Sequence, residues 1–383
     1  MGAGTENVPP FIGAQLSHLL SHSRLTLKID QLWSSDKYNS GLIDRFTLLI
    51  PYCLDFIKWD IIFDAESPNV APDVIFGPED EHFHPFHMSP PSVEPNNNNN
   101  NSSLLSDWNY KDPKCLLNFI QFLRDQYVLY QAKRVGEVDD DRLKFEISTI
   151  VSREGLEMHM CSFVDKSEEV KFAVPLLDMN INKMVSGCPW RQSQKIYLQV
   201  VYPVGRKYMS APSAPRLKLV SSSELKALYS IDDVKLPPWL NGMCLAEYLP
   251  NLEEYLEKQV LEAVSLIDVR RQFIEALADE LGRPVEADPV FCRKATFLSA
   301  SGVLTFLVHF VIPTQFPKQQ PVIMLQSSQH FNAQMAPLKS RPMSDYPWSP
   351  RWEPSLMAER IFEFLVDEAL NFKRQCSEGQ LQL

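Results

Sequence analysis

The chain repeats one pattern of apolar and polar residues three times, and each copy predicts strands followed by a helix. In the first copy, residues 44–50 and 56–63 predict neighbouring strands, and apolar residues at every second position give the later strand one buried face. A short strand is predicted at 73–76. Large apolar residues then recur at spacings of three and four over 116–130, which predicts an amphipathic helix.

The second and third copies repeat this order. Their strands are predicted at 156–163, 170–177, 195–202, 216–220, 303–312 and 322–326. Helices are predicted ahead of the three copies at 12–23, 139–151 and 266–281, and after the last copy at 357–372. The apolar period hardly breaks from 251 to 281, which predicts one long helix shared by the second and third copies.

Prolines and a tryptophan mark the same place in each copy. Two spaced prolines stop one strand and aim the next, because proline fixes φ and lacks an N–H donor. These structural marks are Pro68, Pro72 and Trp108, then Pro203, Pro215 and Trp239, then Pro317, Pro321 and Trp352. The recurrence predicts three tandem modules, at 1–135, 136–264 and 265–383. A polar, Asn-rich stretch at 89–103 predicts a disordered insertion in the first module.

Composition limits the classes of partner. The 383 residues carry 37 basic and 48 acidic side chains, a net charge of −11, which argues against binding to nucleic acid or to an acidic membrane. Glycines number 13 against 29 prolines, so Gly-rich phosphate loops are not expected. The seven cysteines are widely spaced without a Cys-x-x-Cys pair, which predicts reduced thiols in the cytoplasm or nucleus. No apolar run reaches the roughly 18–20 residues that a membrane span needs.

The repeated order of helix, strands, proline-spaced turn, tryptophan and helix resembles the ubiquitin-conjugating (E2) core and its relatives, the E2-variant (UEV) and RWD domains. This resemblance implies an α+β fold of three UEV/RWD-like modules, each an antiparallel meander sheet with flanking helices. Three segments resemble the BRE family more closely: Ile-Lys-Trp-Asp-Ile-Ile-Phe at 57–63, Pro-Asp-Val-Ile-Phe-Gly at 72–77 and Tyr-Pro-Trp-Ser-Pro-Arg-Trp at 346–352. The match runs from about residue 44 to the C terminus, weakens in the middle module, and does not include the Asn-rich insertion.

The BRE resemblance implies a non-enzymatic role in a protein assembly. Members of that family are scaffold subunits of BRISC and BRCA-A type complexes, which cleave lysine-63-linked ubiquitin chains and serve DNA-damage signalling and DNA repair. The implied partners are a JAMM-class zinc deubiquitinase with its pseudo-enzyme partner, a von Willebrand-A-type adaptor, and ubiquitin. The implied location is both cytoplasmic and nuclear, with no cofactor and no direct contact with nucleic acid or membrane.

Conjugating activity is not expected, because the segment that carries the E2 nucleophile lacks cysteine in every copy. These segments are 72–108, 215–239 and 321–352.

The nearest approach to a metal site is the run from Glu81 to His87. His82 and His84 at i and i+2 of an extended segment are able to ligate one zinc ion. The order resembles the JAMM peptidase pattern, but Pro95 stands where that pattern has an aspartate. Two alternatives to the scaffold therefore stay open: a stand-alone ubiquitin-binding E2-variant adaptor, and a divergent JAMM-like zinc peptidase using His82 and His84.

The sequence assigns no catalytic, cofactor-binding or metal-binding residue. Its candidate partner-binding residues are Trp348, Arg351 and Trp352, which lie close together in a proline-rich loop. His159 and His309 fall inside predicted strands and are expected to be core or edge histidines. The acidic run 139–141 is expected to open a helix, where negative charge favours the N-terminal end of the helix dipole.

Overall fold

The computed structural model describes most of the chain, in two compact units. The described residues are 7–34, 42–64, 66–86, 105, 108–161, 168–176, 181–188, 190, 194–204, 214–332 and 334–380. Unit 1 consists of Met1–Pro175, Tyr197–Val220 and Asn241–Ala246, and unit 2 of Leu176–Ile196, Ser221–Leu240 and Glu247–Leu383. The predicted disordered insertion, 89–103, lies outside the described residues.

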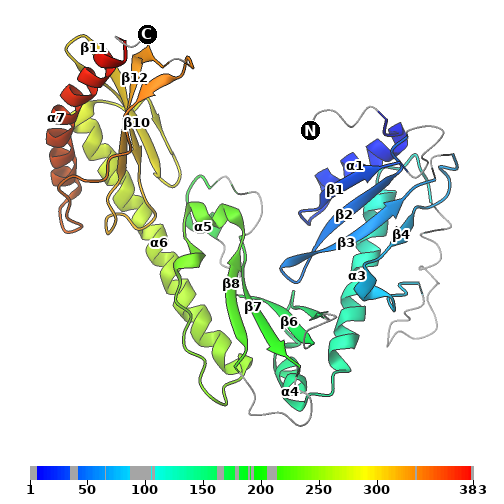
Figure 1. The fold of residues 1–383 in the computed structure, drawn as a ribbon. Helices are drawn as coiled ribbons and strands as arrows, with labels where there is room; N and C mark the ends of the chain where they lie inside the picture. Colours follow the sequence, from blue (N-terminus) through cyan, green and yellow to red (C-terminus); the bar gives the residue numbers. More distant parts are fainter. Residues whose placement is uncertain are drawn as a thin grey trace. The chain divides into compact units, whose positions relative to one another are not determined.

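The first sheet of unit 1 is a meander that packs against helices. Its strands follow one another in space as they do in the chain: β1 (Lys28–Trp33), β2 (Arg45–Tyr52), β3 (Asp55–Ile62) and β4 (Asp73–Ile75) (Figure 1). Helix α1 (Pro10–His22) precedes them, and α3 (Cys115–Gly136) follows the short 3-10 helix Pro78–Asp80.

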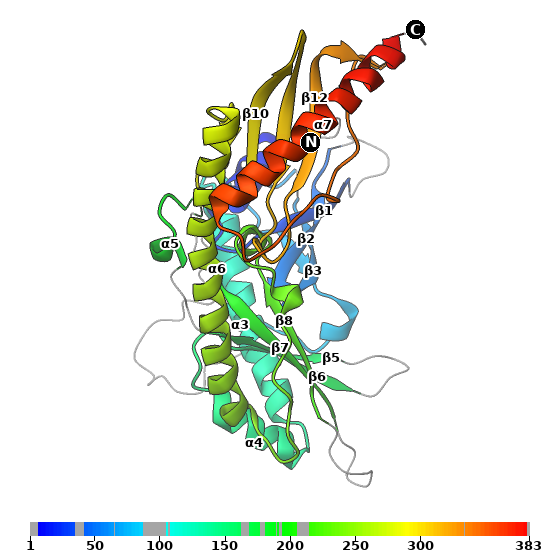
Figure 2. The ribbon, with the colours of Figure 1, turned by 90° about the vertical axis from the view of Figure 1, so that its left-hand side faces the viewer.

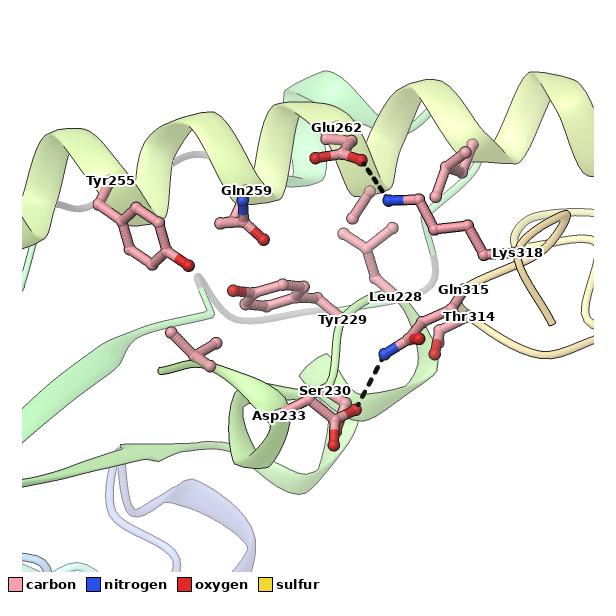
Figure 3. Close-up of a pocket in the computed structure, with 13 residues that line it drawn as sticks. Leu228, Tyr229, Ser230, Asp233, Tyr255, Gln259, Glu262, Thr314, Gln315 and Lys318 are labelled. Carbon is pink, nitrogen blue, oxygen red and sulfur yellow. Dashed lines mark hydrogen bonds and ion pairs between the residues drawn. The ribbon is translucent and has the colours of Figure 1, made fainter. Parts of the chain in front are cut away.

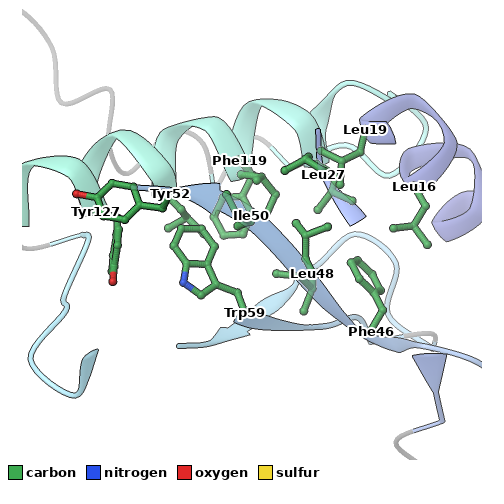
Figure 4. Packing of buried hydrophobic residues seen from close by; sticks show 14 of the residues in the cluster. Leu16, Leu19, Leu27, Phe46, Leu48, Ile50, Tyr52, Trp59, Phe119 and Tyr127 are labelled. Atoms are coloured by element: carbon green, nitrogen blue, oxygen red, sulfur yellow. The ribbon is translucent and has the colours of Figure 1, made fainter. Parts of the chain in front are cut away.

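The core of unit 1 forms where α1 and α3 meet this sheet. Phe46, Leu48 and Ile50 of β2 alternate inward and are at most 1% exposed. Figure 4 shows them beside Trp59 of β3 and Phe119 of α3. Full burial of such side chains is worth about 1.5–3 kcal/mol each, so this layer holds the helices to the sheet.

The turn between β2 and β3 has an unusual backbone. Tyr52 pairs with Asp55, so the turn consists of Cys53 and Leu54, both at positive φ (49° and 64°). Two consecutive residues with positive φ are typical of a type I′ hairpin turn, where asparagine and glycine are preferred because a Cβ is strained in this region. The turn is therefore maintained by contacts outside the hairpin.

A second meander sheet lies almost entirely in unit 1. Its order is β5 (Glu157–Cys161), β6 (Glu169–Pro175), β7 (Ile196–Pro203) and β8 (Arg216–Ser221). Helix α4 (Asp141–Ile150) precedes it and is capped by Asp140, whose carboxylate accepts from the Leu143 N–H at 3.1 Å. The predicted helix start at the acidic run is confirmed.

Strand β5 supplies the contacts that hold the β2–β3 turn. The Tyr52 hydroxyl donates to the Met158 carbonyl at 2.6 Å. The Cys53 N–H donates to a Glu157 carboxylate oxygen at 2.6 Å, and the other oxygen forms an ion pair with Arg124 of α3. The two sheets are thus joined by buried and half-buried polar contacts within one unit.

Unit 2 contains the third sheet. Its meander order is β9 (Glu286–Ala287), β10 (Lys294–Ser301), β11 (Leu304–Val311), β12 (Val322–Phe331) and β13 (Pro337–Lys339). Figure 2 shows α7 (Pro354–Gln380) lying across these strands. Helix α6 (Leu245–Leu281) directly precedes the sheet. It confirms the single long helix predicted over 251–281. In the structure this helix begins six residues before the predicted start.

A buried arginine of α6 is bonded to the loops of the third sheet. Arg270 is fully buried, its Nε donates to the Phe291 carbonyl at 2.9 Å and its Nη1 to the Thr314 carbonyl at 3.2 Å. Burial lowers the pKa of this guanidinium to about 10. It remains charged at neutral pH, so its bonds to carbonyls are charge-assisted.

The α+β class and the antiparallel meander sheets are confirmed. The identity of each sheet with a UEV/RWD-like module, and the boundaries after 135 and 264, stay predictions. Within the part of the chain that the structure describes, no helix has the length and apolar character needed to cross a bilayer.

Candidate binding site

The tryptophan-rich loop before α7, residues 346–352, is held in place by contacts of the Trp348 side chain. Its indole N–H donates to the Pro317 carbonyl at 3.0 Å, and its ring packs against Phe273 and Phe316 at centroid distances of 6.2 and 5.6 Å. The Tyr346 hydroxyl donates to the Pro321 carbonyl at 2.5 Å. The loop is therefore fastened to the Pro317–Pro321 turn.

The other two candidate residues of this loop remain accessible. Arg351 is exposed and Trp352 is half-buried. The structure thus brings Trp348, Arg351 and Trp352 into one loop, with the polar atom of Trp348 already bonded. Their partner-binding role stays a prediction.

The remaining prolines of the repeat lie at strand ends or in the turns between strands, and its other two tryptophans pack against aromatic rings. Pro72 and Pro215 directly precede β4 and β8, and Pro203 is the last residue of β7. Pro68 lies in the turn before β4, and Pro317 and Pro321 lie between β11 and β12. Trp108 packs on Phe63 and Phe119, and Trp239 on Tyr248 at 5.2 Å.

The histidine-rich segment does not form a ligand cluster in the described residues. His82 and His84 are exposed, whereas Phe83 between them is 2% exposed and packs on Trp59 and Tyr127. His87 lies outside the described residues. Among the residues that are described, no three His, Cys, Asp or Glu side chains are grouped to hold a metal ion.

Four of the seven cysteines are unsuited to nucleophilic chemistry. All seven cysteines lie within the described chain, and none of them forms a disulfide there. Burial raises the pKa of Cys53, Cys161, Cys292 and Cys376 above the ordinary thiol value. A raised pKa keeps the thiol protonated, and the thiolate is the nucleophile. These side chains act as small apolar residues.

A pocket in unit 2 brings together three segments of the chain (Figure 3). Its volume is about 260 Å³. One wall is the face of α6 with Tyr255, Gln259, Glu262, Ala263 and Leu266. The others are residues 228–230 with 233–234, from the segment after β8, and residues 314, 315 and 318, from the loop after β11.

The pocket has an aromatic floor and a charged rim. Tyr229 is 8% exposed, and its hydroxyl is buried without a hydrogen-bond partner in the described chain. At the rim, Lys318 donates to Glu262 at 3.3 Å and the Gln315 amide donates to Asp233 at 3.5 Å. Burial raises the pKa of Tyr229, so the phenol stays neutral, and its oxygen is able to accept a hydrogen bond. Sequence reasoning missed this site, because no local spacing links its three segments.

Comparison with known proteins decides the family. The model of the family described as "Brain and reproductive organ-expressed protein (BRE)" matches residues 7–331. The chain belongs to the BRE family. A relative named "BRISC and BRCA1-A complex member 2" from Danio rerio is 32% identical over 326 residues, which cover 83% of this chain and 80% of the relative. A relative of the same name from Branchiostoma floridae is 28% identical over 340 residues, covering 86% of this chain and 84% of the relative.

The BRE match includes all three segments of the pocket, since residues 228–318 fall within 7–331. It ends before the tryptophan-rich loop. The resemblance seen in the sequence is thus confirmed as BRE membership.

Proposed function

We propose that this BRE-family chain is a non-catalytic scaffold subunit of a BRISC- or BRCA1-A-type deubiquitinase complex. The observation that carries the proposal is the near-full-length similarity to two relatives, both named as member 2 of these complexes. Alignment over four-fifths or more of both chains favours a shared role for the whole protein rather than for one segment.

The proposed complex cleaves lysine-63-linked ubiquitin chains and acts in DNA-damage signalling and repair, in cytoplasm and nucleus. The proposed partners are a JAMM-class deubiquitinase with its pseudo-enzyme partner, a von Willebrand-A-type adaptor, and ubiquitin. The peptidase chemistry and the zinc belong to another subunit in this proposal. The buried thiols of Cys53, Cys292 and Cys376, whose pKa values burial raises, and the exposed His82 and His84 support that division.

Affinity purification of the tagged full-length chain, followed by mass spectrometry, tests the proposal. A JAMM-class subunit recovered in stoichiometric amount is the expected result. Recovery of the chain with ubiquitin alone would instead support the stand-alone adaptor.

The peptidase alternative has its own assay. The purified chain alone is expected to leave lysine-63-linked ubiquitin chains intact. Cleavage by the chain alone, with stoichiometric zinc and with activity lost in His84→Ala, would overturn the scaffold proposal.

A further inference from the structure

We propose that the pocket on α6 binds the side chain of an arginine from a partner protein. The inference deepens the scaffold proposal and rests on it for the origin of the arginine, because it names one contact through which a complex would be held. The binding chemistry itself belongs to this chain alone.

The size of the pocket fits one side chain. Pockets that enclose a whole small molecule usually measure roughly 300–1,000 Å³, whereas this one measures about 260 Å³. Anchoring of a single large side chain in such a pocket is common at protein interfaces, where arginine, tyrosine and tryptophan contribute most of the binding energy.

The buried hydroxyl of Tyr229 points to a polar ligand. Its side chain is 8% exposed, and the hydroxyl oxygen is buried with no bonding partner among the described residues. Figure 3 shows the hydroxyl directed toward the side of the pocket formed by Tyr255. Buried polar groups are paired in the great majority of cases, so a ligand that donates a hydrogen bond here satisfies an otherwise unpaired atom.

The charges favour a cation. Among the side chains that line the pocket, Asp233 and Glu262 supply two carboxylates against one ammonium, that of Lys318. The guanidinium of Arg270, which bonds the Thr314 carbonyl, is not among them. The surrounding half of α6, residues 245–264, carries five glutamates and one lysine. A cationic ligand is therefore attracted to this end of unit 2, and an anionic one is repelled.

A guanidinium fits better than an ammonium. It is planar, has five donors and is weakly hydrated, so it is suited to lie on tyrosine rings while bonding carboxylates. Tyr229 and Tyr255 supply the rings, and the Asp233 carboxylate accepts a long hydrogen bond, 3.5 Å, from the Gln315 amide. The Lys318 ammonium already donates to the Glu262 carboxylate at 3.3 Å, so it competes with an incoming guanidinium for that carboxylate.

A titration of the full-length chain tests the pocket without any partner. The chain is labelled at the methyl groups of leucine, valine and alanine, and N-acetyl-arginine methylamide is added. The methyl signals of Leu228, Val234, Ala263 and Leu266, which line the pocket, are expected to shift and saturate. The citrulline analogue has the same shape without the charge and is expected to bind at least about tenfold more weakly, since charged hydrogen bonds are the stronger ones.

Three variants sharpen the test. Asp233→Asn is expected to weaken arginine binding about fivefold or more, while the neighbouring Asp232→Asn, which pairs with Lys226 outside the pocket, leaves it unchanged. Lys318→Ala removes the competitor and is expected to strengthen binding. Equal binding of citrulline, an unaffected Asp233→Asn variant, or shifts confined to methyls outside the pocket would each overturn the site.

The origin of the arginine is tested separately in the tagged chain. Asp233→Asn is expected to lose one partner from the purified complex that Asp232→Asn retains. Full recovery of every partner by Asp233→Asn would overturn the docking role even if free arginine binds. Failure to recover a deubiquitinase subunit with the unaltered chain concerns the scaffold proposal alone, because the titration uses no partner.

Discussion

The hydroxyl of Tyr127 on α3 donates to the carboxylate of Asp80, 3.1 Å from each oxygen, inside the core of the first sheet. Tyr127→Phe removes this donor from a carboxylate that is 7% exposed. The free energy of unfolding is expected to fall by about 1–3 kcal/mol, the cost of leaving a buried group with fewer partners. Urea unfolding of the purified chain measures it.

Tyr229→Phe is the matched control for that measurement. The Tyr229 side chain is also buried, at 8% exposed against 1% for Tyr127, but its hydroxyl has no partner in the described chain. Its removal is expected to change stability by less than about 0.5 kcal/mol. Equal losses in the two variants would contradict the assignment of the Tyr127 hydrogen bond.

Glu157 is predicted to be a major contributor to the stability of unit 1. Glu157→Ala removes the partner of both the Cys53 N–H and the Arg124 guanidinium. Because the pair is largely but not fully buried, the expected loss is about 2–3 kcal/mol, below that of a wholly buried pair. The exposed Glu154→Ala serves as control. A double-mutant cycle with Arg124→Ala isolates the ion pair, and a coupling energy near zero would refute it.

The lowered pKa of His159 predicts that the protein loses stability in acid. Burial, with the charges of Lys171 and Arg134, lowers the pKa of His159 to about 4. The unfolded chain binds a proton near the ordinary value of about 6.5, so between these values the unfolded state binds more protons. The free energy of unfolding therefore decreases as the pH falls through this window, by about 1–3 kcal/mol.

The difference between wild type and His159→Gln isolates this contribution. Unfolding curves at pH 7 and pH 4.5 are expected to differ less in the variant than in the wild type. The exposed His82→Gln serves as the comparison variant and is expected to follow the wild type. A wild-type pH dependence retained in full by His159→Gln would exclude the histidine as its source.

Asp140 tests the helix cap at α4. Asp140→Ala removes the acceptor of the Leu143 N–H, and the expected cost is about 1 kcal/mol of unfolding free energy. Asp139→Ala removes a neighbouring carboxylate that forms an exposed ion pair with Lys144 at 3.8 Å, a contact that contributes little to stability. Equal losses of unfolding free energy in the two variants would contradict a specific role for the cap. The loss would then come from the general effect of negative charge near the start of the helix.

The helices and the alternating strands could be predicted because their signals are local. The period of α3 and α6 and the alternation of β3 and β11 appear within short windows of sequence. Strand β1 was missed because most of its side chains are exposed, so no buried face appears in its sequence. Strand β10 was missed because serine, threonine and alanine weaken its alternation.

The candidate site could be predicted only in part. Trp348 is a candidate from the sequence because it lies close to Trp352 in a proline-rich segment. Only the structure shows that its indole N–H donates to the Pro317 carbonyl. Tyr229, Glu262 and Gln315 come from separate segments, and their meeting depends on the fold of unit 2. A buried, unpaired hydroxyl leaves no trace in a hydropathy pattern.

The residues that hold the β2–β3 turn are synthesised well after the turn itself. Glu157 lies 104 residues after Cys53, and at about 5–20 residues per second a ribosome needs roughly 5–20 s to add that length. The strands of the first sheet are neighbours in the chain and emerge together. During that interval the strained turn and the Tyr52 hydroxyl lack the β5 groups that bond them in the finished protein. The first sheet therefore has all its strands before the contacts that hold its β2–β3 turn are able to form.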